Sequence, residues 1–195
     1  MKHTSTRDLY RYWNERRGRR LAPERADIDP TAIPRVLADT FLLGVGPDAN
    51  LAFRLAGTRV CALFCRELKG ELFVDLFGRR SRDSIHDLIG VVGDEAVPTV
   101  AGVTGHLDEG DSIDLELLLL PLRHRGRTDA RLLGVLAPIP TPAWIGAMPI
   151  AALTLGTLRH IGSFEDPPRL PILPSAMPAG RLRHGLVVYD GGRTT

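Results

Sequence analysis

The chain has 195 residues, 44% of them hydrophobic, which is enough for one domain with a substantial core. Its 25 basic and 23 acidic residues nearly balance to a formal net charge of +2, which argues against nucleic acid as the default partner. No apolar run reaches the roughly 18 residues of a membrane helix, and no signal peptide is recognisable, so we expect a cytoplasmic protein.

An amphipathic helix is predicted at the N-terminus, from Ser5 to about Arg17. Serine and threonine at its start favour an N-cap, and Asp8 is expected in the first turn, where the helix dipole stabilises a carboxylate. One apolar stripe follows, made of Leu9, Tyr10 and Trp13. Gly18 and the prolines after it end the helix, so residues 1–34 are expected to form a helix and linker before the core.

Five strands are predicted from alternating or continuous apolar runs, at residues 38–45, 50–56, 97–107, 112–120 and 131–137. The first two form a hairpin through a turn at Gly46-Pro47-Asp48. In the second strand, alternation places Leu51, Phe53 and Leu55 on one face. In the fourth strand, Asp114 and Glu116 alternate with leucine and isoleucine, which indicates that one face of the strand is exposed to solvent.

Helices are expected between the second and third strands, around 58–68, around 72–77, and from Ser81, which can serve as N-cap, to about Val92. The element order is therefore β-β-α-α-α-β-β-β, and the core is expected to span residues 35–162. Residues 163–195 are rich in proline and are predicted to be an extended C-terminal tail.

Short motifs run in order along residues 5–162: LYxYW from Leu9, RGxR from Arg17, PxR from Pro23, DIDP from Asp27, FRLAGT from Phe53, CALF from Cys61, RELxG from Arg66 and LLLPL from Leu118. In this order they resemble a bacterial, mainly alphaproteobacterial, family of stand-alone PAS domains formerly known only as a domain of unknown function. One departure is Cys65, which stands where the family is expected to have glycine, so a side chain falls where bare backbone is favoured.

The resemblance implies an α/β (α+β) fold, a five-stranded antiparallel sheet with helices on one face and an additional N-terminal helix. It also implies a non-enzymatic regulator of motility, cell-cycle or stress pathways, and it supplies no ligand. Because no kinase, cyclase or DNA-binding segment is recognisable, the output is expected to pass to another signalling protein, such as a kinase.

A PAS fold would form a cavity between the sheet and the middle helices. The expected lining is Phe53, Leu55, Cys61, Phe64, Phe73, Leu76, Ile89 and Leu117, with Arg54 and Thr58 as polar contacts. The alternative, which stays open, is that these side chains fill the core completely and leave no space for a ligand.

Flavin is not expected, because the chain has no glutamine and only Asn14 and Asn50 to hydrogen-bond an isoalloxazine edge by side-chain amides. Haem remains an alternative through His86 on the longest middle helix, although a solvated histidine is favoured there. The other histidines occur singly, and Cys61 and Cys65 match no metal spacing, so neither a metal site nor a catalytic site is predicted.

The sequence is compatible with two functions. The first is a sensory regulator that binds a small ligand or a protein partner in a signalling pathway. The second is a ligand-free homodimeric adaptor that acts through its arginine-rich N-terminal helix. The expected interface residues are Leu9, Tyr10, Trp13 and Arg17, and packing of this helix against its own domain is the alternative.

Overall fold

The computed structural model describes residues 1–46, 50–108, 110–124, 127–161, 181–183 and 186–188. The chain divides into two units, Met1–Gly162 and Ser163–Thr195. In the second unit, β7 (Arg181–Arg183) and β8 (Leu186–Val188) pair antiparallel, and the rest of the predicted tail lies outside the described residues. The division of the chain at residues 34 and 162 stays a prediction.

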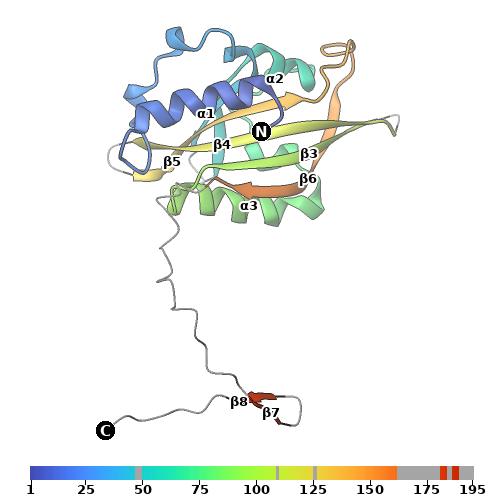
Figure 1. The fold of residues 1–195 in the computed structure, drawn as a ribbon. Coiled ribbons are helices and arrows are strands. Elements are labelled where there is room, and N and C mark those ends of the chain that lie inside the picture. The colour runs from blue at the N-terminus through green and yellow to red at the C-terminus, as the bar shows by residue number, and fades with distance from the viewer. Residues whose placement is uncertain (47–49, 109, 125–126, 162–180, 184–185, 189–195) are drawn as a thin grey trace. The chain divides into compact units, whose positions relative to one another are not determined.

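The first unit is built on an antiparallel sheet of six strands in the order β2-β1-β5-β4-β3-β6 (Figure 1). Its strands are β1 (Thr40–Val45), β2 (Leu51–Ala56), β3 (Thr99–Leu107), β4 (Ser112–His124), β5 (Arg127–Pro138) and β6 (Ile150–His160). The five predicted strands are confirmed. The expected PAS-like α+β fold is confirmed as well, with one strand more than predicted.

The sixth strand, β6, was missed because its apolar alternation breaks. It pairs with β3, but the register shifts twice, between Ala101 and Val103 and between His106 and Leu107. Each shift inserts a residue that reverses which face the next side chains occupy. Leu153 and Leu155 alternate correctly and were the available signal, but Gly156 and the exposed residues after it dilute the pattern.

The sheet has an inner and an outer face. The inner face is covered by α2 (Thr58–Leu63), the 3-10 turn η4 (Phe73–Leu76) and α3 (Arg79–Asp94). The outer face carries α1 (Thr4–Arg17), which lies across β4 and β5 (Figure 1). Three 3-10 turns connect α1 to β1: η1 (Arg25–Asp27), η2 (Pro30–Ala32) and η3 (Leu37–Asp39). No helix of the described residues is long and apolar enough to cross a membrane.

Both helix starts differ from their prediction. The helix α1 begins at Thr4 with His3 as N-cap, whose Nδ1 accepts from the Ser5 amide at 3.2 Å, and Asp8 lies beyond the first turn. The helix α3 begins after Gly78, so Ser81 is not its cap. Instead the buried Ser81 hydroxyl accepts from the Leu155 amide at 3.2 Å and ties α3 to β6.

Four phenylalanines form the centre of the core between the sheet and the inner helices. The rings of Phe41, Phe53, Phe73 and Phe77 contact one another with centroids 5.4–5.8 Å apart, in stacked and edge-on arrangements. Gly134, opposite Phe41 in the sheet, leaves room for this cluster. A Cβ atom at Gly134 would lie 2.3 Å from the Phe41 ring.

Replacing Gly134 by alanine should therefore strain the whole core. We expect Gly134→Ala to lower the free energy of unfolding by about 3 kcal/mol, at the upper end for overpacked cores, as measured by urea denaturation. Gly90→Ala in α3 is the control, since its new Cβ would meet only the Asp94 carboxylate at 4.0 Å. That variant should gain about 1 kcal/mol from higher helix propensity. A Gly134→Ala protein as stable as wild type would contradict this account of the core.

Candidate functional site

Most of the residues predicted to line a cavity meet in the packed core. Phe53, Phe64, Phe73, Leu76 and Leu117 are buried in one cluster with the other two phenylalanines, and the partly buried Cys61 and Ile89 pack against it. The phenyl rings occupy the space between sheet and helices. The packing therefore favours the alternative in which these side chains fill the space between the sheet and the inner helices. Their contact with a ligand stays a prediction.

The prediction that Arg54 and Leu55 face this cavity is wrong, because β2 carries a bulge. Leu42 of β1 pairs with Leu55 while Leu43 pairs with Phe53, so Arg54 is an extra residue without an opposite partner. The bulge reverses the alternation and brings Leu55 opposite Leu42. Leu55 is 51% exposed, and Arg54 is also exposed. Thr58, the first residue of α2, is exposed as well rather than facing the core.

The histidine and cysteine candidates do not form a reactive centre. His86 is exposed on α3, which is the position of a solvated histidine and not of a haem ligand buried in the core. Burial raises the pKa of the Cys61 thiol, and the nearby Glu67 carboxylate raises it further, so Cys61 is a poor nucleophile at neutral pH. Cys65 is exposed with φ of 51°, which confirms that it occupies a position favouring glycine. No metal-binding group of three acidic, histidine or cysteine side chains occurs among the described residues.

The apolar stripe of α1 packs on the chain's own sheet. Leu9 and Trp13 are buried against the outer face of β4 and β5, and the Trp13 indole donates to the Pro121 carbonyl at 2.8 Å. The predicted homodimer interface through these two residues is therefore wrong, because their surface is already covered. Tyr10 and Arg17 stay partly exposed, and both contact the Trp13 ring.

Two buried carboxylates fix the N-terminal end of α1 to the rest of the domain. Asp39, 1% exposed, accepts from the Ser5 hydroxyl at 2.5 Å and from Nε and Nη2 of Arg59, each at 2.6 Å. Glu116, 6% exposed on β4, accepts from the backbone amides of Lys2 at 2.6 Å and His3 at 2.9 Å. The alternation in the fourth predicted strand placed Glu116 on a solvent-exposed face, and no sequence pattern pointed to Asp39.

These contacts set the charge state of both acids. Burial alone would raise the pKa of Asp39, but the hydrogen bonds from Arg59 and Ser5 outweigh it and lower the pKa below its ordinary value of 3.8. In the same way, burial opposes ionisation of Glu116, but the amides of Lys2 and His3 lower its pKa below 4.5. Both groups are therefore carboxylates at neutral pH.

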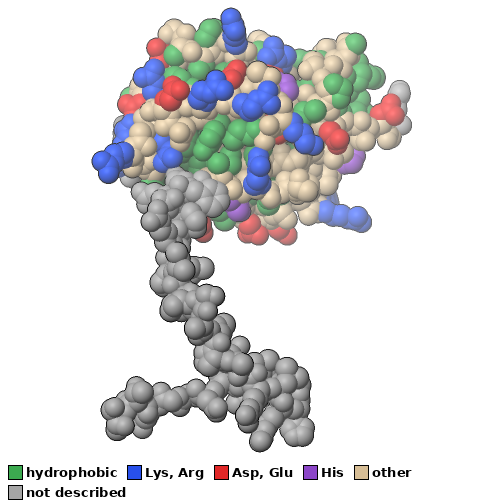
Figure 2. Space-filling model, viewed as in Figure 1, with side chains coloured by type: hydrophobic (Ala, Val, Ile, Leu, Met, Phe, Trp, Pro, Cys, Tyr) green, Lys and Arg blue, Asp and Glu red, His purple; other side chains and the backbone are tan. Residues whose placement is uncertain are grey.

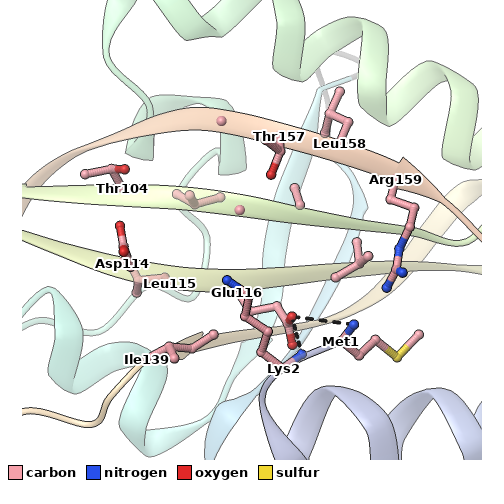
Figure 3. Close-up of a pocket in the computed structure, with 15 residues that line it drawn as sticks. Met1, Lys2, Thr104, Asp114, Leu115, Glu116, Ile139, Thr157, Leu158 and Arg159 are labelled. Atoms are coloured by element: carbon pink, nitrogen blue, oxygen red, sulfur yellow. Dashed lines mark hydrogen bonds and ion pairs between the residues drawn. The ribbon is translucent and has the colours of Figure 1, made fainter.

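A groove of about 540 Å³ lies beside α1, where the helix leaves β3, β4 and β6 uncovered. We call it the β3–β6 groove. Its lining is Met1, Lys2, Val100–Thr104, Asp114–Glu116, Ile139 and Gly156–Arg159. Arg159 and Asp114 lie towards opposite ends (Figure 3), because Arg159 pairs with Val100 and Asp114 with Thr104. Figure 2 shows hydrophobic side chains on the face that carries α1, with lysine and arginine around them.

Acid should release α1 from the sheet. Because the folded-state pKa values of Asp39 and Glu116 lie below their unfolded values, their contribution is complete above the unfolded values and is lost as the pH falls through the folded ones. Asp39→Asn should lower the free energy of unfolding at neutral pH by about 2 kcal/mol and flatten its acid dependence. Urea titrations across acidic pH, followed by Trp13 fluorescence in a Trp144→Phe background, measure both effects.

The matched control is Asp87→Asn, which removes an exposed carboxylate from α3. It should change neither the stability at neutral pH nor the acid dependence. If the Asp39 and Asp87 variants behaved alike, the carboxylate anchor would not hold α1.

A family model described as a PAS domain matches residues 1–137. Among solved structures, the light state of the blue-light photoreceptor Aureochrome1 LOV has 16% identity and a TM-score of 0.41, with 55% of this chain and 86% of that chain covered. An RNA-binding Light-Oxygen-Voltage receptor has 18% identity and a TM-score of 0.42, with 56% and 33% covered.

The PAS domain of an HTR-like protein from Haloarcula marismortui has 16% identity and a TM-score of 0.36, with 55% of this chain and 90% of that chain covered. No curated protein matches the chain. The family match spans more than half of the chain and includes α1, the phenylalanine cluster and both anchoring carboxylates. The chain belongs to the PAS domain family.

Proposed function

We propose that this chain is a non-enzymatic regulatory PAS domain of the bacterial cytoplasm that acts by protein contact through the β3–β6 groove. The first partner is a second copy of the chain, and the signal passes to a separate protein such as a kinase. The observation that carries the proposal is the phenylalanine cluster, which occupies the space where a ligand inside the sheet and helices would lie.

The groove has the features of a contact surface. Its floor is built from small and threonine side chains of β3 and β6, so another protein can approach the strands closely. Residues 156–160 of β6 are all exposed, while Leu153 in the first half of the strand forms a bridge with Phe77. An edge that is open over this length can accept another strand or a loop.

The charges of the groove favour a second copy. It carries a basic side chain, Arg159, towards one end and an acidic one, Asp114, towards the other. A twofold interface brings the same surface together with itself, so each charge can meet its opposite only when both signs are present. A partner of a single sign would find one half of the groove repulsive.

A bulky side chain in the groove tests this proposal. Thr157→Trp places an indole on the exposed part of β6, where it should block the approach of a partner. We expect the dissociation constant of the dimer, measured by sedimentation velocity, to rise about tenfold or more, equivalent to about 1.4 kcal/mol. Ser84→Trp adds the same ring to the exposed face of α3 and should leave the dimer unchanged.

Two results would overturn the proposal. One is a wild-type protein that stays monomeric at all concentrations measured and retains no partner. The other is a dimer that Ser84→Trp weakens as much as Thr157→Trp does, since the contact would then lie on the helical side.

The filled core also makes a spectroscopic prediction. With no flavin or haem in the core, the purified protein should show no absorbance band in the visible region. A band that survives gel filtration and disappears in a His86→Ala variant would restore the haem alternative.

A further inference from the structure

A second hollow, of about 490 Å³, lies on the outer face over β1 and β2. The linker between α1 and β1 forms its roof through Ile28, Ile33 and Leu37, and the strands form its floor through Leu42 and Leu55. We call it the linker hollow. It shares no lining residue with the β3–β6 groove, although both reach β4, the groove at residues 114–116 and the hollow at Leu122.

The linker hollow exists because of the β2 bulge. In a regular strand without the bulge, Leu55 would lie on the same face as Phe53, and the floor would lack one of its two leucines. The bulge instead sets Leu42 and Leu55 side by side under the linker. Leu55 keeps 51% of its surface exposed, so the domain leaves a large apolar side chain at this site in contact with water. An apolar ligand of suitable size would cover it.

Arg25 is the one charged residue in the lining of the linker hollow. Its acidic neighbours in sequence pair elsewhere, Asp27 with Arg20 at 2.7 Å and Glu24 with Arg123 at 3.4 Å. Within the described residues Arg25 makes no ion pair, and its Nη1 has only a long hydrogen bond to the Ile28 carbonyl, at 3.4 Å. A partly buried guanidinium without an acid is suited to a carboxylate, which it can bind through two parallel hydrogen bonds.

We propose that the linker hollow binds an amphiphile with one aliphatic chain and one carboxylate, of the medium-chain fatty acid class. The leucine and isoleucine side chains cover the chain, and Arg25 binds the carboxylate. The size of the hollow suits a ligand of this class, since sites for small molecules typically span about 300–1,000 Å³. The proposal does not depend on the function assigned to the β3–β6 groove.

The site is coupled to α1 through one residue. Ala38 and Thr40 line the linker hollow, and the Asp39 between them holds Ser5 of α1 and Arg59 of α2. A ligand that orders residues 38–40 therefore also stabilises the anchor of the helix. In this way occupancy of the linker hollow is converted into firmer docking of α1.

Isothermal titration calorimetry with the whole chain tests the site. Decanoate should bind with a stoichiometry of one, while 1-decanol, which lacks the charge, should bind about tenfold more weakly. Butyrate, whose aliphatic chain is much shorter, should give no measurable heat of binding. Equal affinity for decanoate and 1-decanol would exclude a role for Arg25.

Paired variants locate the site. Arg25→Gln and Leu55→Asp should each weaken decanoate binding about tenfold. The control Arg35→Gln removes an exposed arginine of the same linker, and Leu21→Asp changes an exposed leucine that lines neither the hollow nor the groove. Both controls should bind as wild type does. The proposal would be overturned if decanoate binding could not be saturated, or if all four variants weakened it equally. Neither result would change the dimer measured by sedimentation, so failure of this site and failure of the proposed function are distinguishable.

Discussion

The docking of α1 on the outer face is the constraint on which the rest of this domain depends. Leu9 and Trp13 are buried there, and each large apolar side chain removed from water contributes about 2 kcal/mol. Hydrophobic contact alone would let the helix slide along the sheet. The position is fixed by Asp39 and Glu116, since each carboxylate accepts directional hydrogen bonds from the first residues of the chain. By covering the centre of the sheet, α1 divides the outer face into the β3–β6 groove and the linker hollow.

The packed inner face is the reason why we propose a functional role for the outer face. Four contacting phenylalanine rings, with Gly134 leaving room for one of them, occupy the space between the sheet and the inner helices. Under the proposed function, a signal would be carried by surfaces that change when α1 is released from the sheet. The groove meets this requirement, because Lys2 and Glu116 belong both to its lining and to the anchor of the helix.

The elements with local signals could be predicted from the sequence, and the contacts that define the sites could not. Alternating and continuous apolar runs predicted five strands, and the apolar stripe predicted α1 with two of its three residues, Leu9 and Trp13, buried, while Tyr12 is buried in place of Tyr10. The expectation about Cys65 was confirmed because a glycine-favouring conformation is a property of one residue. Leu55 was assigned to the wrong face, since a bulge at Arg54 depends on register with β1 and leaves no mark in β2 itself. The pairings of Asp39 and Glu116 with α1 join residues 34 to 114 positions apart, beyond any local pattern.

Asp39 also connects the two faces of the sheet. It binds Ser5 of α1 on the outer side and Arg59 at the start of α2 on the inner side, and the residues on either side of it line the linker hollow. Because a buried carboxylate that has lost one of its partners is costly, the contacts of Asp39 with Ser5 and Arg59 would form or break together. A domain with a filled core can therefore still respond to a ligand. The change would pass from the linker hollow through Asp39 to α1, and from α1 to the β3–β6 groove, without any cavity in the interior.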